Sequence, residues 1–318
     1  MQGRFVSGRY TQPVLSVLAI LMWFVGFYLL PATQVTEWNG IGMEAVSPLL
    51  ASGISLLCYV AVAFMLASLH LIEQRIHWLP ALYMWIVALA LFVHGNVLWA
   101  VSAMLFMLLK VMLFVCHPIQ GVESSLFAAF AILGVGSLVF PQFLYILPLG
   151  IVYMFVVNIM SPKRFMAAML GLVTPFWLVA GAAYVYPSAV ILLSPFFAGA
   201  ENLLQFRIAE PLPMRLLLTF IELVVMLPAI AVFVSMHVPS KPILRRRMAF
   251  VILTNVYLLL LSWLSVDNFE LFFTWRISGI AIMTSYVFLL KISKVSNVYF
   301  VFINILWFAV AAFSLWQS

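Results

Sequence analysis

Long apolar segments separated by short polar breaks follow one another along the whole chain. A helix that crosses the hydrocarbon core of a bilayer needs about 20 apolar residues, and eleven segments of that kind can be delimited. They cover residues 13–30, 47–70, 78–94, 97–116, 123–140, 142–160, 166–186, 213–236, 248–266, 272–290 and 298–316. None of them shows the alternation that marks a transmembrane β-strand. The pattern predicts an all-α fold, a polytopic integral membrane bundle of about eleven transmembrane helices.

The composition excludes a water-soluble protein. Hydrophobic residues occupy 66% of the 318 positions and charged residues only 8%, whereas globular domains have about 45–50% and about 25%. A soluble enzyme is therefore excluded, and the net charge of +6 does not indicate a nucleic-acid partner. The histidines and cysteines lack the spacing of metal ligands, so we predict no metal and no cofactor. We expect a single transmembrane domain over residues 1–318, surrounded by membrane lipids.

The cations gather in alternate loops. If the N-terminus is cytoplasmic, 11 of the 15 Lys and Arg residues lie in inner loops, as the positive-inside rule requires. We therefore predict a cytoplasmic N-terminus and, with an odd number of helices, an outer C-terminus. Two of the outer loops are then long, at about 31–46 and 187–212, and most acidic residues lie on the outer side. This distribution predicts a cavity that opens outward near these two loops.

Two arginines stand at the predicted outer interface, before and at the start of the 213–236 segment. They are Arg207 and Arg215, with Glu210 between them. Arginine binds phosphate oxygens through two parallel hydrogen bonds, and a helix N-terminus adds further donors. These three residues are therefore candidates for binding a phosphate or pyrophosphate group. The alternative is structural, with the arginines anchoring the loop or pairing with Glu201 and Glu210.

A second charged group stands where the 272–290 segment is predicted to begin. Asp267 and Glu270 precede the segment and Arg276 opens the helix. Acids favour a helix N-terminus, so in one interpretation they cap the helix and pair with Arg276. In the other interpretation Arg276 joins the phosphate clamp, Glu270 lines the substrate site, and Asp267 is a catalytic group that accepts a proton.

Glu222 is an acidic residue near the middle of a predicted span. A carboxylate inside a membrane is costly and counts as functional by default. Its spacing of seven residues from Arg215 places both side chains on nearly the same helix face, about two turns apart, so both are expected to line one cavity. The structural alternative is a buried pair with Lys110, which lies within the 97–116 segment.

The first outer loop carries two further candidate catalytic residues. Glu37 and Glu44 are close in sequence to Trp38. A general base must lie where the acceptor of a transferred group arrives, and an outer loop satisfies that condition. The alternative is a solvated loop whose tryptophan belongs to the interfacial aromatic belt.

The middle of the chain, about residues 125–190, resembles a known family. The motifs that carry the resemblance are LGVGSLVFPQF at 133–143, SPKRF at 161–165 and GLVTPF at 171–176. They resemble a family of polytopic inner-membrane proteins of Bacteroidota. In layout they also resemble glycosyltransferases that draw sugars from polyprenyl phosphate carriers. The resemblance implies a multi-pass protein of the bacterial inner, or cytoplasmic, membrane with a polyprenyl phosphate carrier as partner.

Three functions agree with these observations. In the first, the protein handles a polyprenyl-phosphate-linked sugar or another anionic lipid at its outward-facing cavity, and a glycosyltransferase is the enzyme class expected. In the second, it is a flippase or proton-coupled transporter of an anionic substrate in which Glu222 titrates. In the third, it is a non-catalytic subunit that docks a membrane-protein partner through its outer loops.

Overall fold

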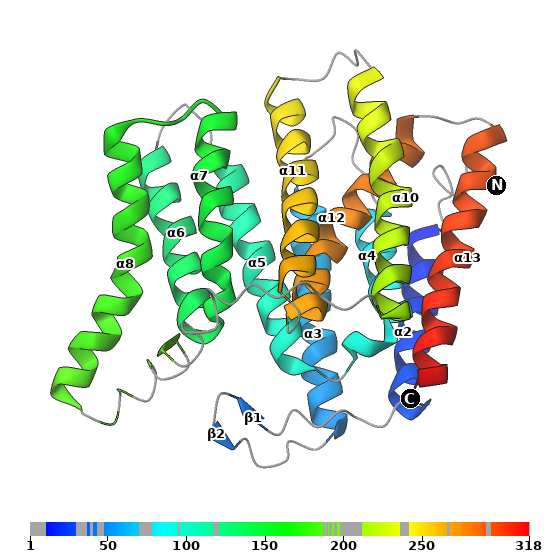
Figure 1. The fold of residues 1–318 in the computed structure, drawn as a ribbon, viewed down its shortest axis with the longest axis horizontal. Coiled ribbons are helices and arrows are strands. Elements are labelled where there is room, and N and C mark those ends of the chain that lie inside the picture. Colours follow the sequence, from blue (N-terminus) through cyan, green and yellow to red (C-terminus); the bar gives the residue numbers. More distant parts are fainter. Residues whose placement is uncertain are drawn as a thin grey trace. The chain divides into compact units, whose positions relative to one another are not determined.

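The predicted polytopic helical bundle is confirmed. The computed structural model describes residues 11–29, 37–38, 41–42, 48–69, 78–94, 96–116, 121–186, 188, 190, 193, 196–197, 212–235, 242–265, 268–290 and 294–317. Within these ranges the chain forms eleven α-helices, two 3-10 helices and one minimal hairpin (Figure 1). Eight of the described helices are long and apolar enough to cross a membrane, and three further apolar helical segments are shorter.

The helices cluster into two compact units. The first comprises Met1–Gln34, Val46–Ala100 and Ile208–Ser318, and the second comprises Val35–Ala45 and Val101–Arg207. The boundary at Ala100 falls within one helix, α5 (Val97–Val115). A single hydropathy pattern over residues 1–318 therefore covers two groups of helices, each with its own internal packing.

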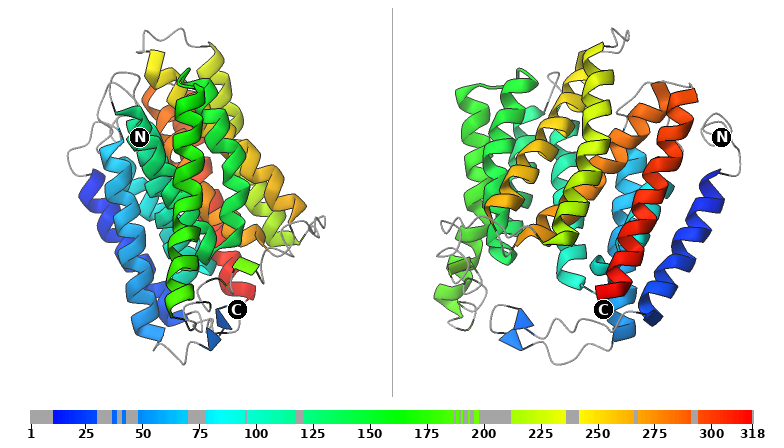
Figure 2. Two further views of the ribbon diagram at one scale, coloured as in Figure 1. Left: turned by 90° about the vertical axis from the view of Figure 1, so that its left-hand side faces the viewer. Right: turned by 45° about the vertical axis from the view of Figure 1, so that its right-hand side comes forward.

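The first unit is built around α12. Its helical elements are α2 (Thr11–Leu29), α3 (Pro48–Ser68), α4 (Leu79–Leu89), η1 (Leu91–Val93), α10 (Pro213–Ser235), α11 (Pro242–Leu264), α12 (Phe269–Leu290) and α13 (Lys294–Gln317). Helix α12 packs against α4, α10 and α11, and almost all of it between Phe269 and Phe288 is buried (Figures 1 and 2). By contrast, α13 leaves a row of large apolar side chains exposed, as a helix in contact with lipid does.

The second unit is built on one close helix pair. It holds most of α5, followed by α6 (Val122–Val139), η2 (Pro141–Ile146), α7 (Leu147–Val156) and α8 (Pro162–Val185). Helices α6 and α8 pack against each other, and small residues allow the close approach. The strands β1 (Glu37–Trp38) and β2 (Ile41–Gly42) also belong to this unit and pair antiparallel.

Each of the eleven predicted segments contains a helical element. Two of them, 78–94 and 142–160, divide between an α-helix and a 3-10 helix, and the other differences lie at the ends. Helix α8 begins at Pro162, four residues before the predicted start, because the Ser161 hydroxyl accepts a hydrogen bond from the Arg164 amide at 3.3 Å. Helix α11 begins at Pro242, before the predicted residue 248. Charged residues at its start lower the hydropathy without ending the helix.

One placement that bears on the site was wrong. Arg276 does not open its helix, because α12 already begins at Phe269. The side chain therefore lies about two helical turns inside α12. This difference moves a guanidinium from the expected helix end into the buried centre of the first unit.

Candidate functional site

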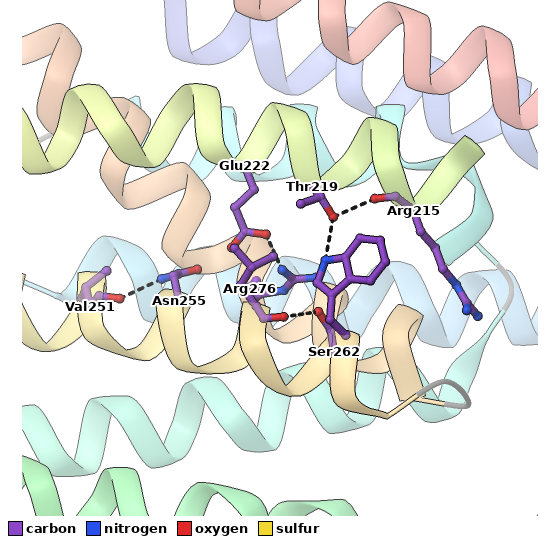
Figure 3. Close-up of polar contacts among 9 residues, drawn as sticks. Arg215, Thr219, Glu222, Val251, Asn255, Ser262 and Arg276 are labelled. Carbon is purple, nitrogen blue, oxygen red and sulfur yellow. Dashed lines mark hydrogen bonds and ion pairs between the residues drawn. The ribbon is translucent and has the colours of Figure 1, made fainter. Parts of the chain in front are cut away.

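Two ion pairs join α10 and α12. In the first, the Arg215 Nη2 on α10 lies 3.4 Å from the Glu270 Oε1 on α12. In the second, the Arg276 Nη1 on α12 donates a hydrogen bond to the Glu222 Oε2 on α10 (Figure 3). The first pair lies near both helix starts and the second about two turns further along both. The two helices therefore run parallel, and each contributes one acid and one arginine.

The two pairs differ in their exposure. The Arg215 side chain is 11% exposed and that of Glu270 is 33% exposed, whereas both side chains of the Glu222–Arg276 pair are fully buried. A partly exposed pair contributes little free energy, because water competes for both charges. A buried pair must offset a large desolvation cost, and removal of either partner leaves a charge without compensation.

The ring of Phe269 connects the two pairs. The Arg215 Cζ lies 5.3 Å from the ring centroid and the Arg276 Cζ lies 5.6 Å from the same centroid. Arg276 is also 5.3 Å from the ring of Phe273, one turn further along α12. Guanidinium groups at these distances are attracted to the aromatic ring. We call Arg215, Glu222, Phe269, Glu270 and Arg276 the α10–α12 charge cluster.

The buried pair leaves polar atoms without a partner. In the described part of the chain, the Nε and Nη2 of Arg276 and the Oε1 of Glu222 are buried and make no hydrogen bond. Buried polar atoms are nearly always paired in proteins, because an unpaired one costs its full desolvation energy. Three such atoms on one ion pair therefore mark a place where a ligand or ordered water would be bound.

Helix α11 adds an amide beside this pair. The Asn255 Nδ2 donates to the Val251 carbonyl at 2.8 Å, while its buried Oδ1 has no partner among the described residues. In Figure 3 this oxygen lies on the side of Asn255 that faces Glu222 and Arg276. The amide stands directly against Gly279 on α12, where a Cβ atom would overlap it. A glycine one turn beyond Arg276 thus lets the amide approach the core of α12.

A second set of contacts fixes α11 against the start of α10. The Trp263 Nε1 donates to the Thr219 hydroxyl at 3.2 Å, and this hydroxyl donates to the Arg215 carbonyl at 2.7 Å (Figure 3). The Trp263 ring also meets the ring of Phe269 edge-on, with centroids 6.0 Å apart. Trp263 therefore holds the helix end that carries Arg215 and the aromatic ring between the two arginines.

The structure brings four of the predicted site residues together. Arg215, Glu222, Glu270 and Arg276 all belong to the α10–α12 charge cluster. Lys110 lies in the second unit on α5, buried, with its Nζ 4.2 Å from the Phe106 ring centroid. The remaining candidates fall outside what the structure describes. They are Glu44, Arg207, Glu210 and Asp267, together with Glu37, of which only the backbone in β1 is described.

The partners of the charged residues differ from the predicted pairings. The sequence offers Lys110 as a partner of Glu222 and an acid at the helix start as a partner of Arg276. In the structure Glu222 and Arg276 pair with each other, across 54 residues of sequence. Arg215 pairs with Glu270, 55 residues away, and the acids of its own loop, Glu201 and Glu210, lie outside the described residues.

Several contributors were missed in the sequence. Asn255 was detectable as an amide within an apolar segment, where a polar side chain needs a reason. Phe269, Gly279 and Trp263 carry no such signal, because aromatic and small residues are common throughout this chain. In the described ranges no three His, Cys, Asp or Glu residues come together in the way that metal ligands do.

The chain matches no family model, no curated protein and no solved structure. Function is therefore inferred from the chemistry of the α10–α12 charge cluster.

Proposed function

We propose that this protein binds an anionic, phosphate-bearing lipid, such as a polyprenyl-phosphate-linked sugar, at the start of α10 and α12. The observation that carries the proposal is that two guanidinium groups, those of Arg215 and Arg276, both lie against the single ring of Phe269. One lies at the helix ends and the other about two turns deeper. Guanidinium groups recognise phosphate oxygens through paired hydrogen bonds.

The apolar surroundings favour an amphiphile over a free phosphate. Both helices are apolar over most of their length, and α10 exposes Leu216, Phe220 and Leu227 on the same helix that carries Arg215. An acyl or isoprenoid chain can lie on such a surface with little cost, because it stays in a hydrocarbon environment. The anionic headgroup then lies at the predicted outer end, where Arg215 is reached first.

Glu270 occupies the place that the ligand would take. Its carboxylate is one-third exposed and lies 3.4 Å from Arg215, so it can move into solvent when the ligand supplies Arg215 with a new counter-ion. Charge-assisted hydrogen bonds from Arg215 to a negatively charged phosphate then replace its one contact with the Glu270 carboxylate. Exchange of Glu270 for the ligand is thus the expected first step of binding.

Sugar transfer would require a general base near the acceptor. Glu37, Glu44 and Asp267 are the candidates that the sequence offers for this role. Binding of the lipid does not depend on them and is tested first.

The experiment is native mass spectrometry of the full-length protein, extracted gently from its own membrane. We expect a phosphate-bearing lipid to be retained by the wild type and lost from Arg215→Ala. The matched control is Arg164→Ala, which removes a guanidinium that also pairs with an acid, Glu123, at 3.5 Å, but in the second unit. Equal retention by both variants, or a wild type that carries no phosphate-bearing lipid, would contradict the proposal.

A transporter of the same class of lipid is a second candidate. It is favoured by α12, which carries Arg276, Thr284 and Ser285 although it is buried over most of its length. Polar and charged side chains in the interior of a membrane bundle mark substrate pathways. A labelled polyprenyl phosphate in proteoliposomes tests this function. Transbilayer movement that requires the wild-type protein and is slowed by Glu222→Gln would support it, and equal rates with and without protein would exclude it.

A further inference from the structure

The two edges of the Arg276 guanidinium differ in their contacts with the described residues. A guanidinium can receive a two-oxygen anion end-on through its Nη1 and Nη2 or side-on through its Nε and Nη2. Glu222 takes only the Nη1 of Arg276. The two donors of the side-on edge, Nε and Nη2, are both fully buried and have no partner among the described residues.

We propose that the Nε–Nη2 edge of Arg276 is an inner oxyanion subsite, which binds a phosphate or carboxylate group together with one proton on Glu222. The inference rests on the anionic ligand proposed above and assigns a deeper position to its charged group. The side-on edge matches two oxygens of a tetrahedral phosphate or of a carboxylate. Binding there leaves the bond between Arg276 and Glu222 in place.

The charge balance of the pair requires the proton. Glu222 and Arg276 neutralise each other, so an added oxyanion leaves one uncompensated negative charge inside the bundle. Such a charge is very costly in surroundings of low polarity. A proton taken from water onto the unpartnered Oε1 of Glu222 removes the excess, while Oε2 still accepts from the Nη1 of Arg276. The oxyanion then becomes the counter-ion of Arg276.

The other titratable groups around α10 are placed less well for this role. On α12, Glu270 is partly exposed and pairs with Arg215. On α13, the Tyr299 hydroxyl donates to the Val224 carbonyl of α10 at 2.9 Å. On α11, Tyr257 is half-buried, and Arg245 lies at the opposite end of the helix, near Phe233 of α10. Tyr83 belongs to α4, which packs on α12.

Asn255 supplies the neighbouring polar group. Its Oδ1 is buried, has no described partner and faces the pair in Figure 3. An amide oxygen accepts hydrogen bonds. It can therefore accept one from the P–OH group of a protonated phosphate, or from a water molecule that accompanies the oxyanion. Gly279 makes room for this amide on α12.

Calorimetric titration of the purified full-length protein with a polyprenyl monophosphate tests the inference. Titrations in buffers of different ionisation enthalpy give the number of protons taken up with the ligand. We expect close to one proton per ligand for the wild type, so that affinity falls by about tenfold for each unit rise in pH. For Glu222→Gln we expect binding without proton uptake and without that pH dependence.

Three further variants separate the subsite from its surroundings. Arg276→Lys keeps the positive charge but has no side-on edge, so we expect binding at least about tenfold weaker. Glu270→Gln should leave the proton uptake unchanged, because its carboxylate belongs to the outer pair. Arg164→Lys, in the second unit, is the matched control for an arginine-to-lysine change and should bind like the wild type.

The outcomes distinguish this inference from the proposed function. A wild type that binds the lipid without taking up a proton, or an Arg276→Lys variant that binds like the wild type, overturns the inner subsite alone. A wild type that does not bind the lipid overturns both. If Glu222→Gln does not fold, the exchange of the pair by Glu222→Arg with Arg276→Glu keeps one buried ion pair. This double variant should fold and lose affinity as Arg276→Lys does, and wild-type affinity would contradict the inference.

Discussion

The helix pairs α6–α8 and α10–α12 must both associate within a membrane, and they do so through different contacts. Apolar helices gain little from associating with each other in lipid, so their contacts depend on close packing and on polar groups. In α6–α8 the close approach dominates. A Cβ on Gly134 would lie 2.5 Å from the Leu172 carbonyl oxygen, and one on Gly171 would overlap the Phe127 carbonyl.

Charges in the α6–α8 pair stay at its end. Glu123, in the first turn of α6, lies 3.5 Å from the Arg164 Nε and 4.0 Å from the Lys163 Nζ at the start of α8. Both contacts are open to solvent. The close contacts at Gly134 and Gly171 involve no charged side chain. This pair has the features of a packing interface only.

In α10–α12, by contrast, charges lie inside the interface at two depths. Gly279 of α12 faces the movable amide of Asn255 on the neighbouring helix α11, and not a backbone carbonyl. Within the described ranges, buried polar atoms of Glu222 and Arg276 remain without a hydrogen-bond partner. An interface that keeps unsatisfied buried groups is less stable than an apolar one, and such exceptions are expected at functional sites. The difference between the two pairs is therefore the main reason to propose a functional site in the first unit.

The largest effect is expected from breaking the buried pair. Glu222→Leu leaves the guanidinium of Arg276 buried without a counter-ion, and arginine cannot lose its proton in a protein. We expect a loss of about 3–5 kcal/mol in the free energy of unfolding, measured as a large drop in the melting temperature in detergent. The double variant Glu222→Leu with Arg276→Met should recover most of the loss. A single variant as stable as the wild type would show that the pair is not buried.

A smaller loss is expected from filling the α6–α8 contact. Gly171→Ala places a methyl group against the Phe127 carbonyl, which belongs to a helix backbone and cannot turn aside. Overpacking of this kind costs about 1–3 kcal/mol. Gly181→Ala is the control on the same helix, because a Cβ there has open space around it. We expect the melting temperature to fall for the first variant only, and equal values would contradict the close contact.

Gly279→Ala should cost less than Gly171→Ala. The Asn255 amide can rotate away from the new methyl group, at the expense of its hydrogen bond to the Val251 carbonyl, worth about 0.5–1.5 kcal/mol. A double-mutant cycle checks the cause. In an Asn255→Ala background the same glycine substitution should be almost neutral. A cost that is unchanged in this background would mean that another group opposes the Cβ.

Hydropathy predicted much of the fold, and local spacing predicted which two charged residues of the site share a helix face. Transmembrane helices leave long apolar runs, and all eleven predicted segments are helical in the described ranges. The prediction that Arg215 and Glu222 share a face of their helix is confirmed, because both side chains reach α12. A spacing of seven residues is about two helical turns, so helical geometry alone places both side chains on the same face.

The pairing across helices was not predictable in the same way. Which acid meets which arginine depends on the register between α10 and α12, and this register is set by packing over more than 50 residues of sequence. Arg276 shows the second reason for error. Hydropathy located the apolar part of α12, but the helix had already begun at Phe269 with the polar residues Glu270 and Thr274 inside it.

The smallest effect is expected at the exposed end of α6–α8. Lys163→Ala removes a cation that is 84% exposed and only just within ion-pair distance of Glu123, so water and salt already screen the contact. Arg164→Ala should cost slightly more, since the Arg164 Nη1 also donates to the Ile159 carbonyl at 3.3 Å. We expect no measurable shift of the melting temperature for Lys163→Ala, and for Arg164→Ala a small shift that persists in high salt, because a bond to a neutral carbonyl is not screened as an ion pair is. A shift for Arg164→Ala that disappears in high salt would assign its contribution to Glu123 instead. A shift as large as that of Glu222→Leu would contradict the distinction between a charge at the end of a helix pair and a charge inside one.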